Sequence, residues 1–435
     1  MPRLLLVPHG KIAQNLAGPG LRALGIARGL SPDVECAFWA PEAEGNELAG
    51  FAVEKSSDAA ALSKAYDYAL VPTLGAMVFE PLPRLTIPVV ADLYDPVFFE
   101  NLFLYRGDVP KEREFQLWRH QVALYETVLN ADAFLSCHKR QSDYWTGMLT
   151  TLGALGFPEF DADQAFASSM IDLPTGLDIP EKSDPQAARQ FMGEIPPDRK
   201  VLLWGGGIYP WLDPCTPLRA LKKLKDQGRD EFSLLFMGVK HPEGSLAADL
   251  VKRTRSEAAA LGLGPQDVHF NEWTPYEKRF DVAAASWAAL IAHGEHVETR
   301  YAFRTRALDA LAAGLPLITA AGDFFAALVE HEEAGAVFPC GEADALAAHI
   351  CNLADRPAVY DNAKQRSKAL GRKFSWRKVC SDLREGLTSG TVKRLKPGAR
   401  QRQVQEHMLK LSIGESTLEK LARKAEKKGK DLFKS

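Results

Sequence analysis

Short apolar runs alternate with longer segments of helical spacing along most of this chain, and the alternation occurs in two separate blocks. Each block contains six apolar runs. Strand and helix in alternation predict parallel sheets that are covered by helices on both faces. The predicted strands are 4–7, 34–39, 68–72, 88–92, 133–137 and 169–174 in the first block, and 201–204, 233–238, 268–270, 288–293, 315–319 and 336–339 in the second.

A polar segment between the blocks divides the chain into two domains. Residues 176–200 hold four prolines and many charged side chains, which is typical of a linker. The 435 residues also exceed the usual size of a single core. We therefore predict an α/β protein with two Rossmann-like, doubly wound parallel-sheet domains that face each other across a cleft. The predicted boundaries are 1–178 for the first domain, 179–199 for the linker, 200–385 for the second domain and 386–435 for a basic helical tail.

Composition excludes several classes of protein. The formal net charge is −3, so nucleic acid is not an expected partner. No stretch approaches the roughly 18 consecutive apolar residues of a membrane span. The six cysteines never form a C-x-x-C pair, which favours the reducing cytoplasm over a disulfide framework or a cysteine metal site. An H-x-x-H pair at 293–296 has no third ligand beside it, so no metal site is expected.

Positive charge gathers at the C-terminal end of the chain. Residues 391–435 carry 13 Lys and Arg against 5 Asp and Glu, whereas the preceding residues carry 40 against 51. Leu418, Leu421 and Ala425 recur at helical spacing among the lysines. A solvated terminal helix explains this pattern. The alternative is a peripheral contact with an anionic membrane or a partner protein.

A glycine cluster follows the first predicted strand of each block. Gly18 and Gly20 lie in AGPGLRALG, which does not fit the dinucleotide fingerprint G-x-G-x-x-G, so a plain tight turn explains them equally well. Gly205, Gly206 and Gly207 directly follow the strand 201–204. Consecutive glycines weaken local order, but they let backbone N–H groups approach a phosphate. Both clusters are candidate ligand-binding loops, and the second has the stronger pattern.

The segment 293–323 carries the densest set of polar side chains. Arg304 and Arg306 stand at the start of a predicted helix, where positive charge opposes the helix dipole unless an anion is bound. Two guanidinium groups beside free N–H groups suit a diphosphate. The alternative is a set of internal ion pairs with Glu295, Glu298 and Asp309.

Part of this segment resembles a known family. The run LDALAAGLPLIT is similar to the EAMAAGLPVI segment of the GT-B retaining glycosyltransferases (glycosyl transferases group 1), which take sugars from nucleotide donors. The resemblance covers most of residues 1–385, with WGGG opening the second domain, FNEWTPYE before the donor-side region and FSWRKV in the closing helix. It implies the GT-B architecture and a nucleotide-sugar donor.

The resemblance also implies roles for single residues. In the family a Glu-x7-Glu pair holds the donor sugar and the ribose. The second glutamate corresponds to Asp309, a shorter carboxylate that can still accept hydrogen bonds from ribose. The first corresponds to Tyr301, and Glu298 is its nearest substitute. The base-contacting loop corresponds to Glu272, beside a tryptophan for which burial is an equal explanation.

The chain departs from the family after its second glycine cluster. The usual arginine and lysine are absent there, because no basic residue appears between Trp204 and Arg219. The resemblance therefore implies that Arg304 and Arg306 supply the missing positive charge.

The segment 87–101 occupies the place where the family often carries a histidine that positions the sugar. Asp92 and Asp95 stand there instead, with Glu100 beyond them. Carboxylates can orient an acceptor hydroxyl or support a developing positive charge. A simple turn is the alternative for Asp95 and the proline after it. His138 follows another predicted strand, and a surface or structural role explains it more simply.

Together these observations predict an enzyme, a glycosyltransferase. It moves a sugar from a nucleotide-diphosphate donor to a hydroxyl of a glycan, lipid-linked or protein acceptor, with retention and without a metal or other cofactor, in glycan or polysaccharide biosynthesis. Asp92, Asp95 and Glu298 are the predicted catalytic residues. Two alternatives remain, a GT-B sugar-nucleotide epimerase and a non-catalytic nucleotide-sugar-binding protein. The fold alone does not distinguish these functions.

Overall fold

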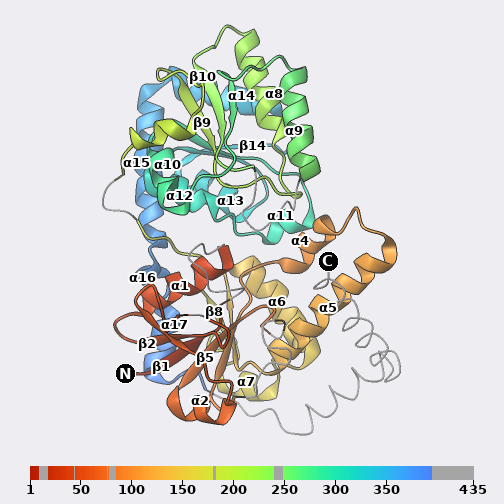
Figure 1. Ribbon diagram of the computed structural model, residues 1–435, viewed down its shortest axis with the longest axis vertical. Helices are drawn as coiled ribbons and strands as arrows, with labels where there is room; N and C mark the ends of the chain where they lie inside the picture. The colour runs from red at the N-terminus through yellow and green to blue at the C-terminus, as the bar shows by residue number, and fades with distance from the viewer. Residues whose placement is uncertain are drawn as a thin grey trace.

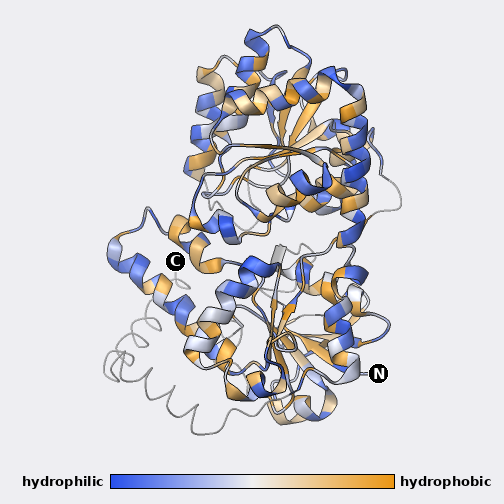
Figure 2. Ribbon diagram, turned by 180° about the vertical axis from the view of Figure 1, so that it is seen from behind, coloured by the Kyte–Doolittle hydropathy of each residue, from blue (hydrophilic) through white to orange (hydrophobic). Residues whose placement is uncertain are grey.

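The computed structural model describes residues 1–8, 18–43, 45–75, 77, 85–179, 183–239 and 248–393. These residues form two lobes, each with a sheet at its centre and helices on both faces (Figure 1). The strands inside each lobe consist largely of hydrophobic residues, whereas the helices around them combine hydrophilic and hydrophobic residues (Figure 2). This layering is expected of parallel sheets, because both of their faces need apolar cover.

The first domain is built on an eight-stranded sheet. Its strands are β1 (Arg3–Leu6), β2 (Glu35–Trp39), β3 (Glu47–Leu48), β4 (Phe51–Glu54), β5 (Tyr68–Pro72), β6 (Val89–Asp92), β7 (Ala133–Ser136) and β8 (Met170–Asp172). They lie in the order β3-β4-β2-β1-β5-β6-β7-β8, and every pair is parallel except β3 with β4.

Helices cover both faces of this sheet. Alternate side chains of the first strand enter different cores, Leu5 and Val7 on one face and Leu4 and Leu6 on the other. The described helices of the domain are α1 (Gly18–Leu30), α2 (Ala59–Ala65), α4 (Val97–Leu104), α5 (Pro110–Leu129), α6 (Lys139–Leu152) and α7 (Phe157–Ala162).

The second domain is built on a six-stranded, all-parallel sheet. Its strands are β9 (Lys200–Trp204), β10 (Phe232–Phe236), β11 (Val268–Phe270), β12 (Ala288–Ile291), β13 (Leu317–Ala320) and β14 (Gly335–Phe338). Their order is β11-β10-β9-β12-β13-β14.

The remaining helices cover this sheet and then lead back to the first domain. They are η1 (Ala187–Phe191), α8 (Cys215–Asp226), α9 (Ala248–Ala260), η2 (Tyr276–Lys278), α10 (Arg279–Ala284), α11 (Val297–Tyr301), α12 (Arg306–Ala313), α13 (Phe324–Glu332), α14 (Ala343–Asp355), α15 (Pro357–Gly371), η3 (Arg372–Phe374), α16 (Trp376–Val379) and α17 (Ser381–Ser389).

The predicted strands are confirmed, since each of the twelve overlaps a strand of the structure. The edge pair β3 and β4 was not among them. The apolar run of β4 is only three residues long, Phe51 to Val53, and none of its residues is fully buried. The antiparallel pairing of this edge also makes the first sheet mixed, where the sequence predicts a wholly parallel one.

Part of the predicted linker packs into the second domain. Ala188, Met192 and Ile195 are buried in the same core as Val201 and Leu203 of β9. Their apolar side chains are spaced among charged and polar residues, which hides the pattern in the sequence. By packing, this stretch belongs to the second domain.

The chain returns to the first domain at α16. Trp376 and Leu383 join the core that contains Leu4 of β1. Glycines make room for the indole ring, because a Cβ atom at Gly25 would overlap it and one at Gly176 would lie 2.6 Å from it. By packing, the second domain therefore ends before α16, and the helices that follow belong to the first.

The return continues into residues predicted as the tail. Leu387 and Val392 are buried in the same core of the first domain. Residues 394–435, and with them the predicted membrane contact of the tail, lie outside the described residues. Among the residues that are described, no helix combines the length and the apolar character that crossing a membrane requires.

Candidate active site

The second sheet has its topological switch point at β9, which lies between β10 and β12. Ligands of open parallel sheets bind at the carboxyl ends of strands at such a point. The three glycines Gly205–Gly207 follow β9 there, and the loop from His293 to Thr305 follows β12 and leads into α12. The switch point therefore brings together the glycine loop and the arginine-rich segment that the sequence singled out.

Arg306 lies against the glycine loop. Its Nη2 donates to the carbonyl oxygen of Gly207 at 2.9 Å, and its guanidinium lies 5.3 Å from the ring centre of Trp204. Its Nη1 is buried without a hydrogen-bond partner. Within the part of the chain that is described, no carboxylate pairs with it, and burial lowers its pKa to about 10. A positive charge without a counter-charge beside backbone glycines suits an anionic ligand.

Arg304 differs from Arg306, although only one residue separates them. Its two terminal nitrogens donate to the two carboxylate oxygens of Glu298, each at 2.6 Å, and Glu298 is fully buried. Its Nε faces Asp323 at 3.9 Å. The charge of Arg304 is thus matched inside the protein, and its predicted role as a donor ligand stays a prediction. The internal ion pair, stated above as the alternative, holds for this arginine.

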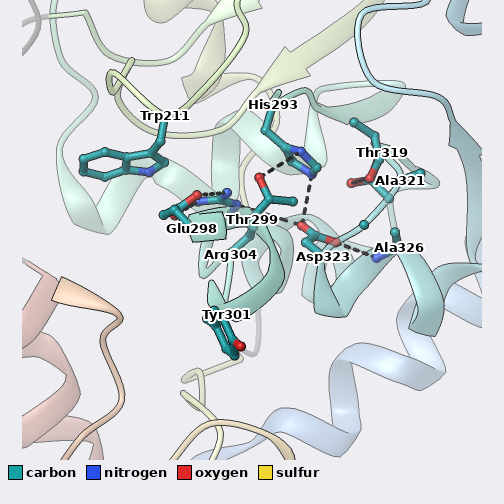
Figure 3. A network of polar contacts seen from close by, with 12 residues as sticks. Trp211, His293, Glu298, Thr299, Tyr301, Arg304, Thr319, Ala321, Asp323 and Ala326 are labelled. Atoms are coloured by element: carbon teal, nitrogen blue, oxygen red, sulfur yellow. Dashed lines mark hydrogen bonds and ion pairs between the residues drawn. The ribbon is translucent and has the colours of Figure 1, made fainter. Parts of the chain in front are cut away.

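A buried network continues from Arg304 to the neighbouring strand ends (Figure 3). Asp323 Oδ2 lies 3.5 Å from Nε2 of His293, and its Oδ1 accepts from the N–H of Ala326 to cap α13. Burial lowers the pKa of His293, but Asp323 and the Cys340 thiol outweigh it and raise the pKa to about 9. Asp323 therefore favours the protonated form of His293, and the network connects the loop after β12 to the start of α13.

Asp92, at the end of β6, is also paired. Arg22 of α1 donates to both of its carboxylate oxygens, at 2.7 and 2.8 Å, and both side chains are almost fully buried. The predicted catalytic carboxylate is thus held by an arginine of α1, the helix that begins at Gly18 and contains Gly20. The sequence analysis did not single out Arg22, because no local pattern indicates its contact with a residue 70 positions away.

Asp95 faces the second domain. Burial raises its pKa to about 7, and the carboxylates of Glu298 and Asp92 add to the shift. Burial, Asp95 and Glu298 likewise raise the pKa of Glu100 well above its usual range. Asp95 therefore lies within electrostatic reach of Asp92 in its own domain and of Glu298 in the second domain. A carboxyl group that titrates near neutral pH is suited to proton transfer.

Aromatic contacts join α4 to α11 at this place. Phe99 stacks on Tyr301 with 5.3 Å between ring centres, and Phe103 lies 4.6 Å from the ring of His296. Tyr301, which stands where the resemblance implies a sugar-binding glutamate, is thus part of the junction between the domains (Figure 3).

The two remaining predicted donor residues are Asp309, in the same helix as Arg306, and Glu272. Asp309 accepts from Nε of Arg279 at 3.0 Å, and burial raises the pKa of its carboxyl. The Arg279 guanidinium lies 3.5 Å from the ring centre of Tyr276. Glu272 is exposed in the loop after β11. Nothing in the described residues gathers three or more His, Cys, Asp or Glu side chains in the geometry of a metal site.

Comparison with known proteins gives a family match for the second domain. Residues 199–356 match the sequence model described as "Glycosyl transferases group 1". No curated protein sequence matches the chain. The fold resembles sucrose-phosphate synthase from Thermosynechococcus elongatus, with a TM-score of 0.60, 15% identity, and coverage of 90% of this chain and 99% of that one.

Two other solved structures are similar over almost the same length. HepE from Anabaena, in complex with UDP-glucose, has a TM-score of 0.60 and 17% identity over 89% of this chain and 100% of its own. WaaG, a glycosyltransferase involved in lipopolysaccharide biosynthesis, has a TM-score of 0.59 and 15% identity over 89% and 100%. Residues 199–356 therefore form a glycosyl transferases group 1 domain within a GT-B fold, and the chain is a glycosyltransferase.

Proposed function

We propose that this glycosyltransferase takes its sugar from a nucleoside-diphosphate donor whose diphosphate binds between Gly205–Gly207 and Arg306. The observation that carries the proposal is the uncompensated charge of Arg306, with Nη1 buried and unpartnered beside the glycine loop. The N-terminus of α12 adds a partial positive charge at the same place. Both would stabilise the negative charge that develops on a leaving diphosphate.

The nucleoside is proposed to lie further along the same domain. Asp309 would accept hydrogen bonds from the ribose, and the loop that carries Glu272 would contact the base. Because HepE has been solved with UDP-glucose, uridine diphosphate sugars are the first donors to test.

The acceptor is proposed to enter from the first domain, next to Asp95. Burial raises the pKa of this carboxyl group to about 7, which suits it to accept a proton from an acceptor hydroxyl. The ion pair of Arg22 and Asp92 would hold the end of β6, from which the chain leads to Asp95. Glu298 would act through its negative charge, which raises the pKa of Asp95. Retention, the absence of a metal or other cofactor, and a place in glycan or polysaccharide biosynthesis are proposed from the family resemblance.

A cytoplasmic location is proposed from the cysteine pattern. The acceptor is a glycan, a lipid-linked group or a protein, and contact of residues 394–435 with an anionic membrane surface is kept as a proposal.

A screen of nucleotide sugars by thermal shift, followed by an assay of nucleoside-diphosphate release, tests this function. We expect one donor to raise the melting temperature and to release its diphosphate when a suitable acceptor is added. Conversion of the donor without an acceptor would indicate an epimerase instead. Donor binding without release in any acceptor mixture would indicate a binding protein.

A further inference from the structure

The start of α6 contacts the second domain through residues that the proposed reaction does not use. Gln141, in the first turn of this helix, is fully buried. Its Nε2 donates to the carbonyl oxygen of Tyr94, in its own domain, at 2.9 Å and to that of Tyr301, in the second domain, at 2.7 Å. One side-chain amide thus connects the two domains.

The orientation of this amide is fixed by its third contact. The backbone N–H of Cys137 donates to Oε1 of Gln141 at 2.8 Å. A backbone N–H can only donate, so the oxygen must face Cys137 and both N–H groups must face the two carbonyls. The amide therefore makes three hydrogen bonds, and no other side chain of this length offers one acceptor and two donors in the same plane.

The residues next to Gln141 also contact the second domain. Arg140 Nη1 donates to the carbonyl oxygen of Gly322, beside Asp323, at 2.8 Å. The ring of His138 stacks on that of Phe324, with 5.0 Å between the ring centres. The same ring caps α6, because its Nδ1 accepts from the backbone N–H of Gln141. Three of four consecutive residues at this helix start thus contact the second domain.

The two carbonyls belong to segments that carry candidate catalytic groups. Tyr94 directly precedes Asp95, and Tyr301 ends the helix that carries Glu298. We propose that Gln141 is a positioning residue: it holds these two segments at the separation in which the carboxyl groups of the two domains act together. The bridge itself is independent of the proposed donor site, whereas the joint action of the two carboxyl groups rests on the proposed function.

Two substitutions of Gln141 distinguish a hydrogen-bonded bridge between the domains from simple packing of the side chain. Gln141→Met keeps the length of the side chain but removes all three hydrogen bonds. Gln141→Glu keeps an oxygen for Cys137, yet a carboxyl group has at most one proton and so cannot donate to both carbonyls. The matched control is Gln190→Met, because Gln190 is exposed and its amide donates to Ala187 in its own turn.

Amide hydrogen exchange of the full-length protein, followed by mass spectrometry without any ligand, gives the readout. We expect exchange in both 94–101 and 297–303 to become roughly 10-fold faster in both Gln141 variants, because buried carbonyls lose their donors. Exchange in β9 to β14 should stay unchanged, and Gln190→Met should behave as the unmodified protein. Since no donor is present, this result is independent of whether the proposed donor site is correct.

Two results would overturn the proposal. One is unchanged exchange at 297–303 in Gln141→Glu, and the other is equal acceleration throughout both domains in that variant, which would show a general packing role. If Gln141→Met accelerates exchange throughout the chain, Gln141→Glu becomes the informative variant, because it retains the hydrogen bond from Cys137.

Discussion

Arg304 holds Glu298 through two hydrogen bonds of 2.6 Å, and the carboxylate is completely buried. Arg306 has no such partner among the described residues, and it lies against the glycine loop instead. The two arginines therefore have different consequences when they are removed. Loss of Arg304 should therefore destabilise the protein itself, whereas loss of Arg306 should weaken the proposed binding of an anion.

Arg304→Ala should destabilise the fold, because it leaves Glu298 as a buried charge without a partner. Breaking one partner of a buried pair typically costs about 3–5 kcal/mol. Urea unfolding measures this, with Arg300→Ala, which removes an exposed arginine of α11, as the control. Glu298→Gln in the Arg304→Ala background should recover part of the loss. A variant as stable as the Arg300→Ala control would show that the pair has no structural role.

Stability should fall as pH rises towards neutrality, because Asp95 binds its proton more tightly in the folded state. Burial, then Glu298 and Asp92, raises the pKa of Asp95 from 3.8 to about 7. Its contribution is complete below about pH 4 and is lost as pH rises through 7. Glu100 shifts in the same direction. Urea unfolding between pH 5 and about 8 should show a weaker pH dependence in Asp95→Asn, and an identical slope in both proteins would contradict the shift.

Gly25→Ala should weaken the packing of α16 on the first domain, because the added methyl group would overlap Trp376. Overpacking of this kind typically costs about 1–3 kcal/mol. Gly147→Ala is the matched control, since it also lies in a helix but its Cβ would meet nothing within 4 Å. There alanine should stabilise by roughly 0.5–1 kcal/mol. The melting temperature should therefore fall in Gly25→Ala and rise in Gly147→Ala. A shift of the same sign in both variants would argue against the close contact.

The sequence predicts the elements that are buried on both faces. The run YALVP at 68–72 is found as a strand with the same bounds, because all five side chains are buried and so form an unbroken apolar run. The glycines at 205–207 likewise indicate the switch point, since little else calls for three consecutive glycines after a strand.

Contacts over long sequence separations explain what the sequence did not reveal. Arg22 meets Asp92 across 70 positions, and Gln141 meets Tyr301 across 160, so no local pattern connects them. Arg304 and Arg306 look alike in the sequence. Which of them finds a carboxylate depends on the direction of each side chain at the turn before α12, and only the folded loop defines it.

Calorimetric titration of the unmodified protein, Arg306→Ala and Arg300→Ala with UDP and UDP-glucose tests the donor site most directly. Charge-assisted contacts to phosphate are worth about 1.5–3 kcal/mol, so Arg306→Ala should raise the dissociation constant by roughly 10- to 150-fold. Arg300→Ala should bind as the unmodified protein does. If these ligands do not bind the unmodified protein, the donor found by the thermal-shift screen takes their place. Equal affinity of the unmodified protein and Arg306→Ala for a donor that binds would contradict a diphosphate site at Arg306.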